Sequence, residues 1–268
     1  EPPRTLAAHI MNVLAADIIE RFYLFLWPML RISAMMLTAP VLSNSAFNRR
    51  ARILLALALT WLVYPLHNWP LLDPTSAQGL AEAFNQILTG ALMGLMLQVV
   101  VAALVVGGQA ISASMGLSMA NLIDPNLGNV PVIAQFLIVI GILIFVGFGG
   151  HAILIGIVSE SFNSMPIGQA LLSQNAFGQV LRWSSMMFLG AVLMALPIMV
   201  TLLFINMGLG VVTRAAPSLN IFAVGFPALI LAGLLILLIS MDSVGGRIEW
   251  LWMQGFTHLR DLVGVPHG

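Results

Sequence analysis

The sequence contains no cysteine and no lysine, and only 7% of its residues are charged. Without cysteine, disulfides, thiolate catalysis and sulfur-ligated metals are excluded. All ten basic residues are arginines and the formal net charge is zero, so no basic patch points to nucleic acid. Alternation of apolar and polar residues is also missing, which argues against a membrane β-barrel. We read no signal peptide in the N-terminal segment, because no charged region leads into a cleavage site.

Hydrophobic residues, by contrast, dominate the chain. They make up 60% of its 268 residues, and the mean hydropathy is +1.01. Several apolar runs exceed the ~20 residues that a helix needs to cross the hydrocarbon core of a bilayer. We therefore predict an all-α, polytopic integral-membrane protein built of helical hairpins.

The apolar runs predict where the helices lie. Leu6–Leu42 is interrupted by Pro28 and by charged residues in its first half, so we expect two helices there, the second over Phe22–Leu42. Ile53–Leu66 is too short to cross a bilayer alone. If every span from Phe22 onward crosses, the arginines divide almost equally between the two sides, so the orientation is not predicted. The other predicted spans, and an amphipathic tail expected at the membrane interface, are Phe84–Val106, Val132–Val158, Ser184–Met207, Phe222–Ser240 and Met241–Gly268.

Two features of these spans predict close contacts between helices. Arg31 lies within an apolar helix, where a central arginine costs about 2.5–3.5 kcal/mol on insertion scales. We expect its side chain to face protein and to pair with an acid such as Glu20. Gly90 and Gly94 have the GxxxG spacing that lets a second helix approach closely.

The stretch Gly107–Pro131 differs from the apolar spans on both sides of it. It is rich in glycine, serine and methionine, and it contains the turn-forming pair Asp124-Pro125. In hydrocarbon an unpaired backbone amide or carbonyl costs several kcal/mol, so an irregular segment at membrane depth survives only inside protein or beside water. One interpretation is an ordinary exposed connector between two helices, and the other is a re-entrant or pore-blocking loop.

No pattern in the sequence predicts an enzyme. The histidines are scattered without an HExxH pair for zinc, and neither a GxSxG elbow nor a Walker loop is present. We predict no catalytic residue, no metal and no cofactor. His151 follows a double glycine within an apolar span, and it is either a titrating group or a histidine packed against a neighbouring carbonyl. Glu160 and Arg214 are candidates for an ion pair between helices, a structural role rather than a catalytic one.

Three blocks of residues occur in a fixed order along the chain. The first contains Gly108-Gln109-Ala110-Ile111, Met115-Gly116-Leu117-Ser118-Met119-Ala120 and Asp124-Pro125. The second runs from Gly150-His151 to Pro166-Ile167-Gly168, and the third joins Arg214-Ala215-Ala216-Pro217-Ser218-Leu219-Asn220-Ile221-Phe222 to Gly225-Phe226-Pro227. Together the blocks resemble the FliR family, core subunits of the flagellar type III export gate that have counterparts in virulence injectisomes.

The resemblance implies an assembly and a place in the cell. FliR-like proteins form a helical hetero-oligomeric pore with FliP-like and FliQ-like subunits, at the flagellar basal body in the bacterial inner (plasma) membrane. A FlhB-like protein wraps the pore entrance, and unfolded rod and other export substrate proteins pass through. The expected chain is one export-gate domain over residues 1–268, with a FliP-like part at 1–177 and a FliQ-like hairpin and tail at 178–268. Membrane lipid is an expected contact and nucleic acid is not.

The resemblance also identifies the glycine- and serine-rich stretch as a plug that fills the pore at rest. A gate that passes many different unfolded chains needs small, weakly interacting groups that move aside, which glycine, serine and flexible methionine provide. The expected plug residues within 107–125 are Gly107, Gly108, Gln109, Ser112, Ser114, Met115, Gly116, Met119, Asn121, Asp124 and Pro125. The residues expected at helix or subunit contacts are Arg31, Gly90, Gly94, His151, Glu160, Arg214, Pro217 and Gly225.

Two other classes of function are weighed against an export-gate subunit. A stand-alone small-solute transporter or ion channel would place several polar groups at mid-span near a broken helix, whereas Gln98, Gln135 and Asn206 are few and widely spaced. An intramembrane enzyme lacks the residues for any mechanism. The gate subunit and the stand-alone transporter differ in their partners, because only the former needs companion membrane proteins.

Overall fold

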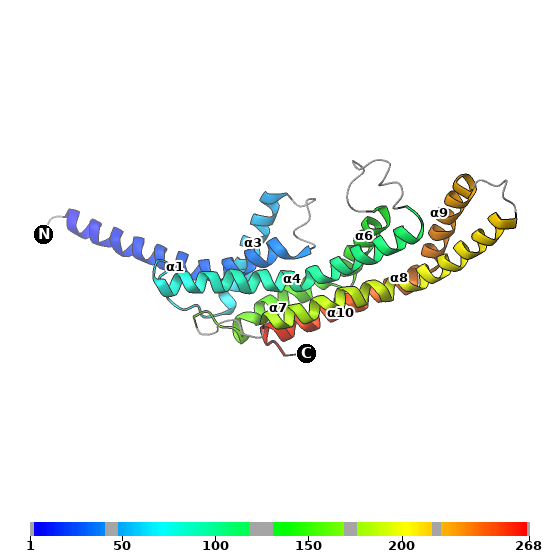
Figure 1. Cartoon of the computed structure of the whole chain (residues 1–268). Coiled ribbons are helices and arrows are strands. Elements are labelled where there is room, and N and C mark those ends of the chain that lie inside the picture. The colour runs from blue at the N-terminus through cyan, green and yellow to red at the C-terminus, as the bar shows by residue number, and fades with distance from the viewer. Residues whose placement is uncertain (1–2, 41–47, 118–130, 169–175, 216–220, 267–268) are drawn as a thin grey trace. The chain divides into compact units, whose positions relative to one another are not determined.

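The computed structural model describes residues 3–40, 48–117, 131–168, 176–215 and 221–266. Every regular element within these ranges is helical, which confirms the predicted all-α class. The elements, labelled in Figure 1, are α1 (Pro3–Thr38), α3 (Arg49–Val63), the short 3-10 helix η1 (Tyr64–Leu66), α4 (Ala77–Ser114), α6 (Val132–Gly147), α7 (Gly150–Ser164), α8 (Ala176–Ala215), α9 (Ile221–Ile239) and α10 (Met241–Val263).

The chain divides into two compact units. The first unit comprises residues 1–98, 154–180 and 259–268, and the second unit comprises residues 99–153 and 181–258. Helices α4, α7, α8 and α10 each contribute residues to both units.

Helix α1 is continuous where the sequence predicted two helices, so that prediction is wrong. Asp17 and Arg21 form an exposed ion pair one turn apart, with an N–O distance of 3.3 Å, and the charged turn therefore fits into a helix. Pro28 also lies inside α1 and removes one backbone hydrogen bond. Its neighbours Trp27 and Arg31 are both fully buried, and this packing holds the helix together through the proline.

Helix α4 begins earlier than the predicted span because the preceding connector is ordered by hydrogen bonds. Asp73 accepts hydrogen bonds from the backbone N–H and the hydroxyl of Thr75, at 2.9 and 2.7 Å. These bonds hold the pKa of the Asp73 carboxyl below its ordinary value. The Ser76 hydroxyl accepts from the Gly79 N–H at 2.9 Å and so caps the helix, which starts at Ala77.

Helix α10 has the amphipathic pattern predicted for the tail, but its apolar face is buried in the chain itself. Trp252 is fully buried, and its indole Nε1 donates to the carbonyl of Gly141 in α6 at 3.0 Å. The ring centroid of Phe145 lies 4.7 Å from that of Trp252 and 5.9 Å from that of Phe256. A helix at the membrane surface needs a free apolar face. The prediction of an interfacial tail is therefore wrong.

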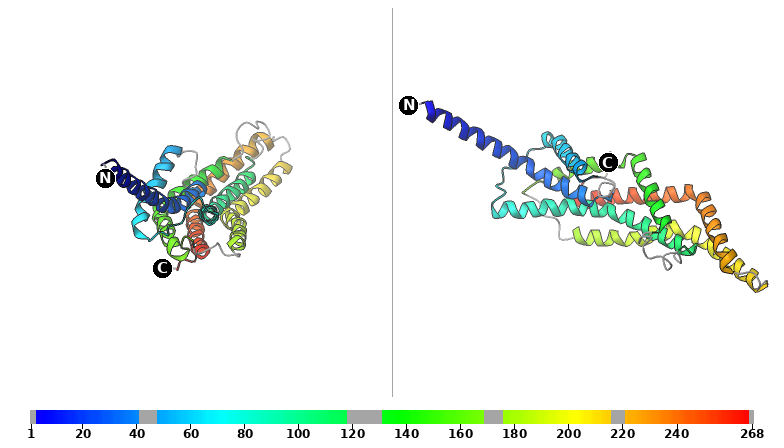
Figure 2. Two further views of the ribbon diagram at one scale, coloured as in Figure 1. Left: turned by 90° about the vertical axis from the view of Figure 1, so that its left-hand side faces the viewer. Right: turned by 90° about the horizontal axis from the view of Figure 1, so that it is seen from above.

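Among the described residues, α4 and α8 are the helices long and apolar enough to cross a membrane alone. Two bent pairs, α6 with α7 and Pro227–Ile239 with α10, bring the total to four if each pair is one broken span. The second pair is bent by 63° (Figure 2). In the first pair the break contains Gly149 at φ +77°, a conformation that favours glycine, so the run Val132–Val158 is not the single straight span predicted. These helices are those of a polytopic membrane protein.

Candidate functional site

The C-terminal end of α4, in the second unit, carries the first part of the predicted plug. Residues Gly107–Ser114 are helical, so the prediction that an irregular stretch begins at Gly107 is wrong. A Cβ atom on Gly107 would overlap Met194 of α8, and one on Gly108 would overlap the backbone of Ala134 in α6. Because these two glycines have no side chain, α4 packs closely on α6 and α8. This packing offsets the ~1 kcal/mol that each glycine costs a helix relative to alanine.

The polar residues of this segment do not interrupt the helix. The Ser114 hydroxyl donates to the carbonyl of Ala110, one turn earlier, at 2.9 Å, which is a common geometry for serine inside helices. Ser112 is buried, and Gln109 is exposed. The Ser114 hydroxyl is therefore satisfied within α4.

A defined turn closes α4 at Gly116. Gly116 has a φ of +79°, the Leu117 N–H donates to the Ser112 carbonyl, and the Gly116 N–H donates to the Ala113 carbonyl, both at 3.0 Å. These two bonds with a left-handed glycine form a Schellman motif, which satisfies the last carbonyls of a helix. The helical part of the predicted plug thus has a fixed end.

Met115 anchors this end of α4 in the second unit. Its side chain is fully buried and occupies the space where a Cβ atom on Gly233 of α9 would lie. The remaining predicted plug residues lie outside the described residues; they are Met119, Asn121, Asp124 and Pro125.

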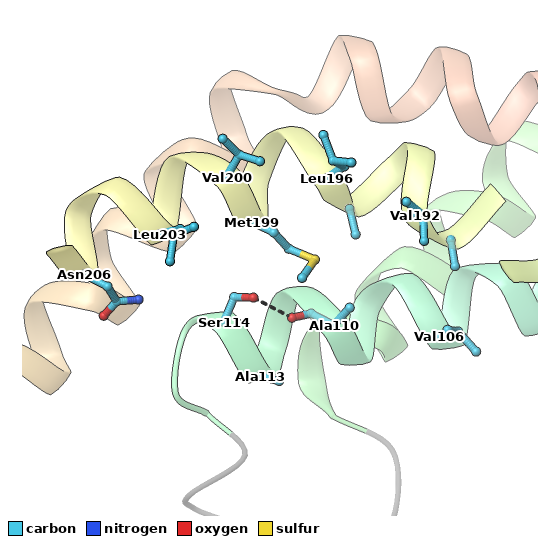
Figure 3. A pocket seen from close by; sticks show the side chains of 12 residues that line it. Val106, Ala110, Ala113, Ser114, Val192, Leu196, Met199, Val200, Leu203 and Asn206 are labelled. Atoms are coloured by element: carbon cyan, nitrogen blue, oxygen red, sulfur yellow. Dashed lines mark hydrogen bonds between the residues drawn. The ribbon is translucent and has the colours of Figure 1, made fainter. Parts of the chain in front are cut away.

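A groove of about 630 Å³ lies between the end of α4 and the middle of α8 (Figure 3). Ala110 and Ser114 of α4 and Ala191 and Ala195 of α8 contribute small side chains at a spacing of four residues, which favours close helix packing. Met199 points from α8 toward the end of α4 in Figure 3. The lining contains no charged side chain. The remaining lining residues are Val106, Ala113, Val192, Leu196, Val200, Leu203 and Asn206. The groove therefore suits an apolar helix or chain.

Arg31 is the centre of a buried polar cluster in the first unit. Its side chain is 1% exposed. Nε donates to Gln86 Oε1 at 2.7 Å, Nη1 donates to the carbonyl and hydroxyl oxygens of Ser161 at 2.8 and 3.0 Å, and Nη2 donates to the Met165 carbonyl at 2.9 Å. The guanidinium also lies 4.3 Å from the ring centroid of Phe162, a cation–π distance. The arginine thus ties α1 to α4 and to α7.

The acid near Arg31 is Glu82, so the predicted pairing with Glu20 is wrong. Glu20 is exposed. Glu82 is 7% exposed, accepts a hydrogen bond from the amide of Gln86, and attracts the Arg31 charge. The pairing with Glu20 fails because Arg31 points toward α4 and α7, whereas Glu20 lies on an exposed turn of α1.

Gly90 and Gly94 lie where α4 packs on α1, also in the first unit. A Cβ atom on Gly90 would overlap the backbone oxygen of Arg31, and one on Gly94 would overlap the Thr38 hydroxyl and crowd the backbone of Ala39. The two helices therefore meet backbone to backbone, the geometry that GxxxG spacing permits.

The other predicted contact residues that the structure describes lie on α7, α8 and α9. His151 and Glu160 on α7 and Arg214 near the end of α8 all have exposed side chains. The two interpretations of His151, a titrating group or a histidine packed against a carbonyl, both stay predictions. Gly225 is buried in α9, and Pro217 lies outside the described residues. The ion pair between Glu160 and Arg214 stays a prediction.

The sequence alone does not identify the residues that accept the Arg31 hydrogen bonds. The signal was a polar stripe on α4, since Glu82, Asn85, Gln86 and Thr89 are spaced to share one helix face and all are buried. Within the described residues no group of three or more histidine, aspartate and glutamate side chains could hold a metal.

The sequence matches the family described as "Bacterial export proteins, family 1" over residues 22–254. Flagellar biosynthetic protein FliR of Escherichia coli (strain K12) is 34% identical over 241 residues, covering 90% of this chain and 92% of that protein. The protein of the same name from Pectobacterium carotovorum subsp. carotovorum is 35% identical over 251 residues, covering 92% and 95%. The one from Bacillus subtilis (strain 168) is 29% identical over 256 residues, covering 93% and 99%.

Proposed function

Because the chain belongs to the FliR family of bacterial export proteins, we propose that it is a subunit of the flagellar export gate. It is a membrane protein of flagellar export and not an enzyme. In the proposed assembly it forms a channel for unfolded flagellar proteins together with FliP-like and FliQ-like subunits, beside a FlhB-like protein in the bacterial inner membrane. The division into a FliP-like part at 1–177 and a FliQ-like part at 178–268 belongs to the same proposal.

The observation that carries the proposal is the long exposed apolar face of α8. Large apolar side chains that are at least 42% exposed occur along this helix from Leu181 to Val212. At ~1.5 Å per residue this face is about 47 Å long, whereas the hydrocarbon core of a bilayer is about 30 Å thick. Lipid alone would cover it only at a tilt of about 50°, beyond the usual range of about 0–40°. Part of the face therefore needs protein to cover it.

The groove between α4 and α8 is a second feature that favours contact with a companion protein. Its small residues would let the backbone of a companion helix approach, which is how helices associate in membranes that offer no hydrophobic driving force. The alternative function, a stand-alone transporter or ion channel, would leave both the groove and the long face of α8 without protein cover.

We expect the chain to be well behaved only when it is made with its companions. Expressed alone, it should aggregate in detergent or be degraded; expressed with FliP-like and FliQ-like proteins, it should elute with them as one monodisperse complex. Size-exclusion chromatography with mass spectrometry of the peak measures this. Leu203→Glu and Phe204→Glu, on the exposed face, should lower the co-purified amount at least about tenfold, and Arg182→Gln should not. A monodisperse chain obtained in equal yield without companions would reject the assembly.

We also propose that the plug lies after the end of α4. The Gly107–Met115 segment is a packed helix end, so the element that moves would begin beyond Gly116 and include the predicted Met119 and Asp124-Pro125. The flexible side chain of Met119 could conform to many different substrates, because methionine adapts to irregular partners. A deletion that reaches into the packed helix would disturb the second unit and would not test the plug.

Replacing residues 118–129 by a short Gly/Ser linker should leave the complex assembled and make the membrane leaky to small ions. The expected result is a membrane potential that collapses in growing cells, followed with a voltage-sensitive dye. The same linker in place of residues 169–175 is the matched control and should leave the potential unchanged. An assembled variant complex with an undisturbed potential would contradict the plug proposal.

A further inference from the structure

A second groove lies in the first unit, between α1 and α3. Its volume is about 250 Å³, below the ~300–1,000 Å³ of pockets that enclose drug-sized ligands. Apolar side chains from both helices make most of its lining, which consists of Met29, Ser33, Met36 and Leu37 of α1 and Arg52, Ile53, Ala56 and Leu57 of α3. The groove therefore has room for one slender apolar chain.

Arginines gather at one end of this groove. Arg52 is part of the lining, and Arg49 and Arg50 lie one turn earlier on the same side of α3 as Ile53. Arg49 and Arg50 are exposed, and neither forms an ion pair within the described part of the chain. The sequence holds no acidic residue from Arg21 to Leu72 that could neutralise them. The positive end of the α3 dipole adds to the same charge.

The rest of α3 is apolar on its exposed side. Ile53 is 60% exposed, Leu54 is 67% exposed and Leu62 is 58% exposed. At about 22 Å the helix is too short to cross a bilayer. A helix with a basic first turn and an apolar body fits a position with its arginines at the lipid headgroups and its body among the acyl chains.

We propose that the α1–α3 groove binds one acyl chain of an anionic phospholipid, with its phosphate held by Arg49, Arg50 and Arg52. Charge complementarity selects this class of ligand, because a guanidinium group can donate two hydrogen bonds to phosphate oxygens, and Arg49 and Arg50 are exposed and form no ion pair within the described residues. The apolar lining selects the acyl chain. The site is separate from the groove on α8 and does not depend on the proposed function.

The test uses the full chain in detergent, with whatever subunits co-purify, after its lipid has been removed. Thermal unfolding is followed during titration with dioleoylphosphatidylglycerol, dioleoylphosphatidylcholine or inorganic phosphate, since a ligand of the folded state raises the melting temperature. Phosphatidylglycerol should raise the melting temperature at a concentration roughly 25-fold lower than phosphatidylcholine does, because two exposed arginines each strengthen binding about fivefold. Phosphate alone should have no effect. Equal action of the two lipids, or phosphate alone reproducing the shift, would overturn the proposal.

Variants separate the two halves of the site. Arg49→Gln combined with Arg50→Gln should abolish the preference for phosphatidylglycerol, whereas Arg182→Gln on α8 should keep it. Ser33→Leu fills the groove and should weaken binding of both lipids, whereas Ala58→Leu, on α3 outside the groove, should not. The lipid-free melting temperature reports whether each variant is folded. A folded double arginine variant that retains the preference, or a folded Ser33→Leu variant that binds both lipids as before, refutes the site.

Discussion

Replacing Arg31 by methionine should lower the free energy of unfolding by about 3–5 kcal/mol, the usual cost of removing one partner from a buried charged cluster. Methionine restores much of the volume, but it donates no hydrogen bond. Gln86 Oε1 and the carbonyl oxygens of Ser161 and Met165 would lose their donor, and Glu82 would remain as a buried acid without its cation. Folded yield in detergent and denaturant titration of the purified complex measure the loss.

Three companion variants show whether the loss comes from the hydrogen-bond cluster. Arg31→Lys keeps the charge but lacks the forked guanidinium, so it should recover only part of the stability. Glu82→Gln added to Arg31→Met should also recover part, because it removes the unpaired acid. Arg21→Met, on an exposed turn of α1, should change stability by no more than about 0.5 kcal/mol. If Arg31→Met were as stable as Arg21→Met, the cluster would have no role in holding the first unit together.

Gly90→Ala should destabilise the protein by about 1–3 kcal/mol although it adds a single methyl group. The added Cβ would meet the backbone oxygen of Arg31, and a backbone atom cannot turn away as a side chain can. Helix α1 would have to move off α4, and the Arg31 hydrogen bonds would lengthen with it. The measurement is the same denaturant titration.

Gly156→Ala is the matched control for this substitution. Gly156 is an exposed helical glycine on α7 with nothing within 4 Å of the added Cβ. Alanine is favoured over glycine in a helix by about 1 kcal/mol, so this variant should be slightly stabilised. The same chemical change is thus expected to have opposite signs at two positions of one unit. Two effects of the same sign and size would mean that α1 and α4 are not in backbone contact.

The sequence predicted the helical class and the approximate helices, because apolar runs of this length have few other structures open to them in a membrane. It did not predict that Arg31 bonds to Ser161, since these residues lie 130 positions apart and only the packing of α1 on α7 brings them together. The polar stripe on α4 was visible, but its partner was not. A sequence pattern shows that one face of a helix must be buried, but it seldom shows which other element buries that face.

Two errors have the same physical origin. The glycines and serines of Gly107–Ser114 have low helix propensity and predict an irregular segment, yet close packing on α6 and α8 outweighs propensity. The amphipathic pattern of α10 predicts a membrane-surface helix, yet Trp252 and Phe256 pack on Phe145 of α6. In both cases tertiary contacts decided between structures that the local sequence left open.

The extended apolar face of α8 also bears on how much of this protein a cell can hold. A newly made copy presents a surface that neither water nor the bilayer fully accepts, and such surfaces attract chaperones and proteases until they are covered. In the proposed assembly, each surviving copy would be one that met its companions in time. The steady-state amount would then follow the scarcest companion rather than this chain's own rate of synthesis, so the number of gates would be set without a dedicated regulator.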